Sequence, residues 1–343
     1  MNTNRKRATI DDVAQLAGVS IKTVSRVLNH EPRVSESTRE RVNGAMETLK
    51  YRPNSSARRL AGNCSYILGL LYDNPSASYI TRVQEGVLEA SKAEHYDILI
   101  YPCNRNDPAF LDDVAEMAAG GRVDGLILTS PITGIKGLRM MMDELQVPCV
   151  VISVPDDSEY RWTVGTNDRE VCAEMVRHLA GLGHKKIAFV LGHPDHTVLL
   201  QRFEGYKDGM NACGLEVAED HCLQGFNTFE SGVENARQLL EKQNPPTAIF
   251  CANDDMAAGV LKVAHEMGIR VPHDLSVAGF DDHPLASQCC PALTTVRQPT
   301  HEMARLATEL LIKRLRRQVS ESVKKDLAST LVIRDSTGAV PIA

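Results

Sequence analysis

Clusters of carboxylates, amides and hydroxyls follow directly after short apolar runs, and these clusters hold the residues best suited to chemistry. They are Tyr72-Asp73-Asn74, Thr129-Ser130-Pro131, Gly192-His193-Pro194, Asn253-Asp254-Asp255 and Asp281-Asp282-His283. Such groups bind polyols, because each sugar hydroxyl can both donate and accept a hydrogen bond. The clusters therefore predict a site for a small polyhydroxyl ligand.

The same clusters leave two other chemistries open. Their carboxylates could form the acid and base pair of a glycosidase, and the candidates are Asp254, Asp255, Asp281 and Asp282. His193 and His196 have the side chains of metal ligands, but no third ligand is indicated by spacing, so a cleft loop is favoured. The sequence has no Gly-x-Gly-x-x-Gly or Walker-type loop and no Gly-x-Ser-x-Gly elbow. We expect no catalytic residue, no cofactor and no metal ion.

The apolar runs that precede these clusters alternate with segments of helical pattern. The runs are Ile67–Tyr72, Ile98–Tyr101, Gly125–Thr129, Cys149–Ser153, Ile187–Leu191, Ala248–Ala252 and Ser276–Phe280. Continuous apolar runs separated by helices indicate parallel strands covered on both faces. The series is too long for one small domain, and its pattern changes near Thr166-Asn167-Asp168. We therefore expect two doubly wound parallel-sheet lobes, with a ligand in the cleft at the carboxyl ends of the strands.

The N-terminal segment has the pattern of two short helices joined by a tight turn. Thr9 is suited to cap the first helix with Asp12 as its partner, and Gly18 ends that helix. Ser20 is suited to cap a second helix, which ends at Leu28, and a third helix is expected over 37–49. The side chains expected on the buried faces are Val13, Leu16, Ala17, Val24, Val27, Leu28, Val42, Ala45, Met46 and Leu49.

The second of these helices carries side chains that suit DNA recognition. In a helix-turn-helix the second helix enters the major groove, and its first residues meet base edges. Here these are Ile21, Lys22 and Thr23, with Arg26 one turn later. Lysine and arginine pair with guanine, and isoleucine contacts a thymine methyl group. The residues better suited to phosphate contacts are Ser20, Thr23, Ser25 and Asn29.

Charge is distributed unevenly along the 343 residues, whose formal net charge is −6. Residues 1–62 hold 12 Lys and Arg against 6 Asp and Glu, whereas the remainder holds 26 against 38. A basic head on an acidic body is expected when one end binds phosphate. The asymmetry predicts double-stranded DNA as a partner and argues against the alternative of an ordinary solvated helical domain.

The sequence indicates a cytoplasmic protein with no membrane partner. No apolar run is long enough to span a bilayer, and the charged N-terminus is not followed by the apolar core of a signal peptide. The 9 cysteines are scattered and include no Cys-x-x-Cys pair. Free, partly buried thiols of a reducing compartment are the favoured interpretation.

A short segment links the head to the body. Pro53 ends the third helical run, and residues 55–61 contain helix formers over about two turns, which is marginal for an isolated helix. Leu60, next to Arg58 and Arg59, has the chemistry of a minor-groove wedge. The alternative is a flexible linker whose leucine packs on the body.

Taken together, these residues resemble the lactose/galactose repressor (LacI/GalR) family over nearly the whole chain. The most specific match is Thr9-Ile-Asp-Asp-Val-Ala-x-x-Ala-Gly-Val-Ser-x-x-Thr-Val-Ser-Arg-Val-Leu-Asn29, which Tyr51-Arg-Pro-Asn-x-x-Ala57-Arg58-x-Leu60 extends. Matches in the body include Ala252-Asn253-Asp254-x-Met256-Ala257, Gly279-Phe-Asp-Asp282 and Pro291-Ala-Leu-Thr-Thr-Val-Arg-Gln298. The resemblance implies a bacterial transcription regulator, usually a repressor, that binds two half-sites of operator DNA as a homodimer.

The resemblance also implies a domain layout and a fold class. A helix-turn-helix DNA-binding domain would span 1–52, a hinge helix or linker 53–64, and an effector-binding and dimerisation domain 65–343. Within that domain, lobe 1 would span about 65–166 and 298–325, and lobe 2 about 167–297 and 326–343. The fold class is therefore an all-α head and an α/β body of two doubly wound lobes that resembles periplasmic sugar-binding proteins.

Site residues are implied by the same resemblance. The DNA-binding set is Thr9, Ser20, Ile21, Lys22, Thr23, Ser25, Arg26, Asn29, Ala57 and Leu60. The effector-binding set is Tyr79, Ile80, Ser130, Thr133, Val198, Arg202, Asn227, Asn253, Asp281 and Gln298. In sugar-responsive members an arginine, an amide and an aspartate hold hydroxyls, which favours Arg202, Asn253 and Asp281. Arg202 has a structural alternative, in which it buttresses the cleft by pairing with an acid.

The effector class stays open between a sugar and a purine. A repressor of carbohydrate-utilisation genes that a small sugar releases from its operator is favoured, because the cleft residues are polar. Asn227 also stands where many members place a stacking ring. The alternative is a purine-responsive, co-repressed regulator of the same architecture, and the remote one is a sugar-acting enzyme with a DNA-binding head. The sequence shows no heptad repeat after the body, which favours a dimer over a tetramer.

Overall fold

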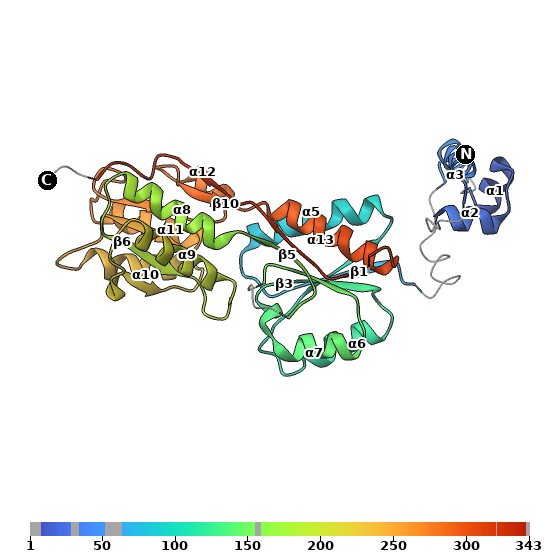
Figure 1. Cartoon of the computed structure of the whole chain (residues 1–343), viewed down its shortest axis with the longest axis horizontal. Coiled ribbons are helices and arrows are strands. Elements are labelled where there is room, and N and C mark those ends of the chain that lie inside the picture. The colour runs from blue at the N-terminus through green and yellow to red at the C-terminus, as the bar shows by residue number, and fades with distance from the viewer. Residues whose placement is uncertain (1–7, 29–33, 52–63, 155–158, 320, 341–343) are drawn as a thin grey trace, which may run out of the picture. The chain divides into compact units, whose positions relative to one another are not determined.

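The computed structural model describes residues 8–28, 34–51, 64–154, 159–319 and 321–340, and the chain divides into two units, 1–65 and 66–343. The first unit contains α1 (Ile10–Ala17), α2 (Ile21–Leu28) and α3 (Glu36–Leu49) (Figure 1). Reciprocal bonds fix the start of α1: Thr9 N donates to Asp12 Oδ2 at 2.7 Å, and Asp12 N donates to Thr9 Oγ1 at 3.3 Å. Gly18 ends α1 with a φ of 63°, a left-handed conformation that costs glycine little.

The core of the head is built from one stripe of each helix. Its buried members are Val13, Ala14, Ala17, Val24, Val27, Val42 and Ala45. Leu16 is 53% exposed, so the expectation that it packs beside Val13 and Ala17 is wrong. At about 100° per residue, Ile10, Val13, Ala14 and Ala17 share a stripe about 100° wide. Leu16 lies beyond the edge of that stripe and is exposed.

Removal of the Thr9 cap tests whether this side chain stabilises the start of α1. We expect Thr9→Ala to destabilise α1 by about 1 kcal/mol, because the orphan amide of Asp12 loses its acceptor. Hydrogen exchange of the α1 amides should accelerate accordingly. Thr48→Ala, at an exposed site on α3, is the matched control and should leave α1 exchange unchanged. Equal exchange in the parent and Thr9→Ala would contradict the assigned cap.

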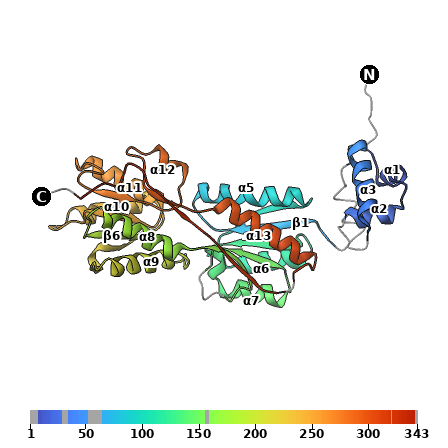
Figure 2. The ribbon, with the colours of Figure 1, turned by 45° about the horizontal axis from the view of Figure 1, so that its top comes forward.

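The first sheet of the body has six parallel strands in the order β11-β5-β4-β3-β1-β2. Their bounds are β1 (Ile67–Tyr72), β2 (Asp97–Pro102), β3 (Gly125–Thr129), β4 (Cys149–Ile152), β5 (Trp162–Thr166) and β11 (Val323–Leu327). One face packs on α5 (Ala77–Ala93) and α13 (Thr300–Leu315), and the other on α6 (Phe110–Ala119) and α7 (Lys136–Glu144) (Figure 2). Strands covered on both faces explain the continuous apolar runs of the sequence.

Close backbone approach joins the two helices on one face of this sheet. A Cβ atom added at Gly86 of α5 would lie 2.2 Å from the carbonyl oxygen of His301 of α13. Only glycine fits at this contact without a backbone shift, so α5 and α13 form a single tight layer.

The second sheet has four parallel strands in the order β7-β6-β8-β9. Its strands are β6 (Ile187–Leu191), β7 (Cys222–Gln224), β8 (Ala248–Cys251) and β9 (Ser276–Ala278), and β10 (Thr295–Arg297) pairs antiparallel with β12 (Thr330–Val332). The surrounding helices are α8 (Asp168–Gly181), α9 (Leu199–Ala212), α10 (Phe229–Leu240), α11 (Asp254–Glu266) and α12 (Pro284–Gln288). The predicted fold class, a helix-turn-helix head and a body of two doubly wound parallel sheets, is confirmed.

Three crossing segments connect the two sheets. They lie between β5 and α8, between β10 and α13, and between β11 and β12. Two of them are tied together, because Ser329 N donates to the side-chain oxygen of Asn167 at 2.8 Å. These short crossings leave the cleft between the sheets as the place where the body can open and close. Among the described helices, we find none with the length and apolar character needed to cross a membrane.

Candidate ligand cavity and nucleic-acid interface

One cavity lies where the carboxyl ends of strands from both sheets face each other. Its lining residues are Asn74, Ser76, Tyr79, Ser130, Ser153, Asp168, His196, Val198, Leu199, Arg202, Asn227, Asn253, Asp281 and Gln298. We call this set the cleft cavity. Ser130 follows β3 of the first sheet, whereas Asn253 and Asp281 follow β8 and β9 of the second. The cavity is thus placed where the sequence pattern predicted a ligand.

Most of the residues expected to bind the effector line this cavity. The structure brings together Tyr79, Ser130, Val198, Arg202, Asn227, Asn253, Asp281 and Gln298. Ile80 and Thr133 are not among the lining residues. Ile80 belongs to the hydrophobic cluster under the first sheet, because it faces inward from α5, and Thr133 is buried in the short helix after β3.

Arg202 is the centre of a buried network. Its side chain is 7% exposed and donates to Asp168 Oδ2 at 2.9 Å and to the carbonyl oxygen of Ala252 at 2.5 Å. Asp281 Oδ1 lies 3.5 Å from the guanidinium and accepts a 2.6 Å bond from Gln298. The guanidinium also stacks on the ring of Phe280, 3.6 Å from its centroid. These contacts make Arg202 a buttress between α8, α9 and the strand ends.

Two amides shape the second-sheet side of the cavity. Asn253 caps α11 by accepting from Met256 N at 3.0 Å, and its Nδ2 donates to the carbonyl oxygen of Asn227 at 3.0 Å. Asn227 has a φ of 61°, a region that asparagine tolerates better than most residues, and its Oδ1 accepts from His193 N at 3.2 Å. The amide at position 227 is therefore a consequence of the backbone turn as well as a polar group for a ligand.

Neutral polar groups outnumber charged ones in the cleft cavity. Burial, with a smaller contribution from His193, lowers the pKa of His196 to about 4, and burial raises the pKa of Tyr79 to about 12. At neutral pH these side chains are an uncharged imidazole and an uncharged phenol. Among the described residues Arg202 is the only cation that lines the cavity, and it faces the carboxylates of Asp168 and Asp281. The cavity therefore has no excess of positive charge that would select an anionic ligand.

The cavity has little free space in this conformation. Its free volume is about 50 Å³, far below the roughly 300–1,000 Å³ typical of small-molecule sites. An ion pair spans the two lobes at its rim: Arg105 Nη2 lies 2.8 Å from Asp195 Oδ2, and Arg105 also bonds Asp73. Entry of a ligand must therefore separate the lobes or rearrange the side chains around Arg202.

Of the four carboxylates that could have formed a catalytic pair, only Asp281 lines the cleft cavity. Asp254 is fully buried, accepts from Thr295 Oγ1 at 2.6 Å and His283 N at 2.8 Å, and burial raises its pKa. Asp282 bonds Arg297 and Arg334 at 2.6 and 2.5 Å. Among the described residues, no group of three or more metal-ligating side chains is present.

Sequence reasoning missed Asp168 as a member of the site. The junction at 166–168 stands out in the sequence only as a change of pattern, although an aspartate two residues after a strand is a usable signal. Ser76, Ser153 and Leu199 also line the cavity without any signal in the sequence, whereas Asn74 belongs to a predicted polar cluster and His196 to the predicted cleft loop. Ser76 and Leu199 lie at the starts of α5 and α9, and Ser153 follows β4, positions whose direction the strand pattern does not fix.

Helix α2 presents the side chains expected to read DNA. Ile21 is 46% exposed and Lys22 is exposed, whereas Val24 and Val27 are buried. Thr23 N donates to Ser20 Oγ at 3.1 Å, so Ser20 caps the helix as expected. Ser25 and Arg26 are half-buried, and Thr9 is exposed. The other expected DNA contacts, Asn29, Ala57 and Leu60, lie outside the described residues.

Both units of the chain match known protein families. Residues 9–54 match a family model described as bacterial regulatory proteins, lacI family, and residues 176–337 match a periplasmic binding protein-like domain. The chain is 35% identical over 312 residues to the HTH-type transcriptional repressor PurR of Vibrio atlanticus (strain LGP32), covering 90% of this chain and 92% of that protein.

Solved structures of similar proteins cover nearly the whole chain. A complex of the transcriptional regulator CelR with cellobiose is 30% identical, with a TM-score of 0.74, and covers 96% of this chain and 100% of that one. A lac repressor dimer bound to operator and the anti-inducer ONPF is 28% identical, with a TM-score of 0.75, and covers 97% and 100%.

Proposed function

This chain belongs to the lacI family of bacterial regulatory proteins, and from that premise we propose that it represses carbohydrate-utilisation genes in the cytoplasm until a small sugar releases it. The working form is a homodimer on double-stranded operator DNA, with α2 of each copy in a major groove. The single observation that carries the ligand class is the composition of the cleft cavity, which is rich in hydroxyls, amides and carboxylates.

A neutral polyol fits this cavity better than an anion or a flat base. Each hydroxyl of a sugar can donate to Asp281 and accept from an N–H of Arg202 or Asn253 that its protein partners leave available. Tyr79 and His196 are the only rings that line the cavity among the described residues, and neither has an opposite ring to sandwich a purine. The complex of CelR with cellobiose, a sugar, supports the same ligand class.

Release from DNA follows from a shift between two lobe arrangements. The ligand must enter a cavity that has little free space, so it favours the arrangement that accommodates it. A changed lobe arrangement in each copy of the dimer alters the spacing of the segments that lead to the heads. The ligand shifts this balance only by the difference between its affinities for the two arrangements.

Calorimetry with two panels distinguishes the proposed effector from its alternative. Titration of the full chain with common sugars should give saturable binding for at least one, and titration with purine bases should give none. Tight purine binding without sugar binding would replace the proposal by that of a co-repressed purine sensor. Hydrolysis of a bound sugar that disappears in Asp281→Asn would instead establish an enzyme.

The ion pair between Arg105 and Asp195 gives a prediction with a smaller expected effect. We expect Asp195→Ala to raise the open population of the body about two- to fivefold, because Arg105 loses its partner in the other lobe. Faster ligand association in stopped-flow measurements is the readout. Asp208→Ala, which breaks a surface pair with Arg169 inside one lobe, is the matched control. Equal association rates in both variants would show that the rim pair does not hold the lobes together.

A further inference from the structure

A second cavity lies at the opposite end of the first sheet from the cleft. It has a volume of about 560 Å³ and is lined by Arg139, Met142, Asp143, Gln146, Val147, Cys149, Glu159, Tyr160, Arg161, Trp162 and Arg314. We call it the arginine cavity. Cys149 and Trp162 are the first residues of β4 and β5, whereas the cleft cavity lies beyond the last residues of the strands. The two cavities share no lining residue, and they lie at opposite ends of the strands of the first sheet.

Charge in the arginine cavity is unbalanced in favour of cations. Both lining acids contact Arg139, which lies 2.9 Å from Asp143 and 2.6 Å from Glu159, so three arginines face two carboxylates in this cavity. Arg161 and Arg314 have no carboxylate within ion-pair distance among the described residues. Two guanidinium groups that line one hollow without a counter-ion are a typical arrangement for binding a carboxylate or a phosphate.

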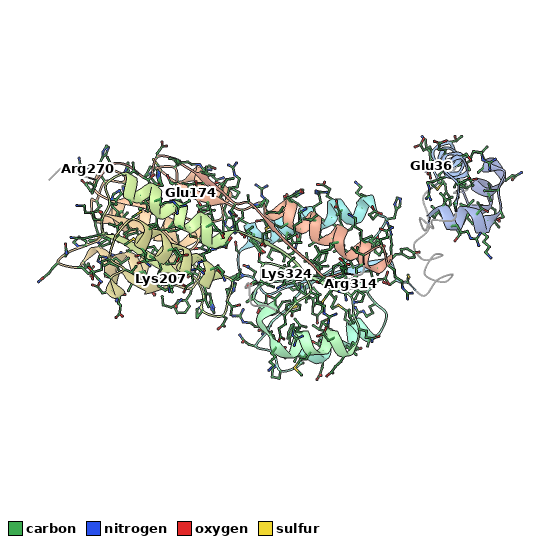
Figure 3. All side chains as sticks on the ribbon, in the orientation of Figure 1. Glu36, Glu174, Lys207, Arg270, Arg314 and Lys324 are labelled. Atoms are coloured by element: carbon green, nitrogen blue, oxygen red, sulfur yellow. The ribbon has the colours of Figure 1, made fainter. Side chains whose placement is uncertain are left out.

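The wall of the cavity holds Arg314 in a fixed position. Its Nη1 donates to the carbonyl oxygen of Cys149 at 2.9 Å, and its guanidinium lies 5.2 Å from the ring centroid of Trp162. Figure 3 marks this side chain at the end of α13. One donor and one ring contact orient the guanidinium but use only part of its five N–H groups. The remaining donors are available to an anion.

Tyr160 supplies an independent observation that points to a ligand in this cavity. Its side chain is only 7% exposed, and its hydroxyl has no hydrogen-bond partner within the part of the chain that the structure describes. A buried hydroxyl without a partner is costly, and such groups are usually satisfied by a ligand or an ordered water. The neighbouring Cys149 offers no competing chemistry, because burial raises the pKa of its thiol to about 11.

We propose that the arginine cavity is a second ligand site, which binds a small organic anion through Arg161, Arg314 and the hydroxyl of Tyr160. The anion carries a phosphate or a carboxylate group, the two groups that guanidinium binds in bidentate geometry. This chemistry is opposite to that of the cleft cavity, where the single arginine is already paired with acids. The two sites therefore take different ligands and do not compete.

The chain contains a single tryptophan, and it lines this cavity, so intrinsic fluorescence reports on the site directly. The full chain is titrated with inorganic phosphate in one arm and with succinate in the other, against sodium chloride at equal ionic strength. We expect a saturable change of Trp162 fluorescence in at least one arm. A change with phosphate alone identifies a phosphate ester as the ligand class, and one with succinate alone identifies a carboxylate.

Matched variants separate the site from general charge effects. Arg161 is exposed, so Arg161→Gln should leave the fold intact and weaken binding about tenfold or more. Arg177→Gln, at an exposed site on α8, is the control and should bind like the parent. Tyr160→Phe should weaken binding without loss of charge. No saturable change in either arm, or equal binding by Arg161→Gln and Arg177→Gln, would overturn the proposal.

Discussion

Replacement of Arg202 by alanine is expected to destabilise the body by about 3–5 kcal/mol and to abolish the response to the effector. The reason is that Asp168, 5% exposed, would be left as an unpaired buried carboxylate, which is costlier than the loss of a contact. The carbonyl oxygen of Ala252 and the ring of Phe280 would also lose their partner. Denaturant unfolding of the full chain measures the loss of stability. Calorimetry with the effector measures the loss of its binding.

A second ion pair between the same two helices provides the control. Arg169 of α8 lies 2.6 Å from Asp208 of α9, but both side chains are about half exposed, so Arg169→Ala should cost less than about 1 kcal/mol. If the two variants were equally stable, Arg202 would not be the buttress described above. If Arg202→Ala were folded and still bound the effector with parental affinity, the cleft assignment would be wrong.

Replacement of Lys22 by alanine is expected to weaken specific operator binding by about 1–3 kcal/mol for each half-site, because an exposed lysine at the start of α2 pairs with a base edge. Fluorescence anisotropy at fixed salt measures this, with an operator selected from random duplexes and a scrambled duplex of equal length. The loss should be larger on the operator than on the scrambled duplex.

Arg41→Ala provides the comparison for this experiment, because Arg41 is exposed on α3 rather than on the reading helix. Its removal takes away the same charge and should affect operator and scrambled duplex alike. Equal discrimination in the parent and in Lys22→Ala would show that α2 does not read bases through this side chain.

Local signals in the sequence predicted the head well. The Thr9 and Ser20 caps and the turn at Gly18 depend on residues within three or four positions of each other, so a local pattern is enough to predict them. Leu16 was placed wrongly because an eight-residue helix leaves the width of its buried stripe to be set by its neighbours. Burial at the edge of a stripe depends on tertiary packing that no local pattern encodes.

In the body, the apolar runs predicted the strands that are covered on both faces, but not the edges. The strand Val323–Leu327 contains Lys324, Lys325 and Asp326, because it pairs on one side only and needs no apolar run. The local sequence pattern also does not indicate the partner of Arg202, since Asp168 lies 34 residues away in sequence. Pairs at such separation depend on how α8 and α9 pack, which follows from the assembled sheet rather than from either segment.

The central claim, that a sugar in the cleft cavity controls binding to operator DNA, is tested most directly by operator affinity with and without ligand. The full chain is bound to the selected operator, and anisotropy is followed as each sugar of the panel is added. At least one sugar should weaken operator binding by about 5- to 150-fold, the range of ordinary allosteric coupling. Operator affinity that no sugar changes, or that a purine base increases, would contradict the account.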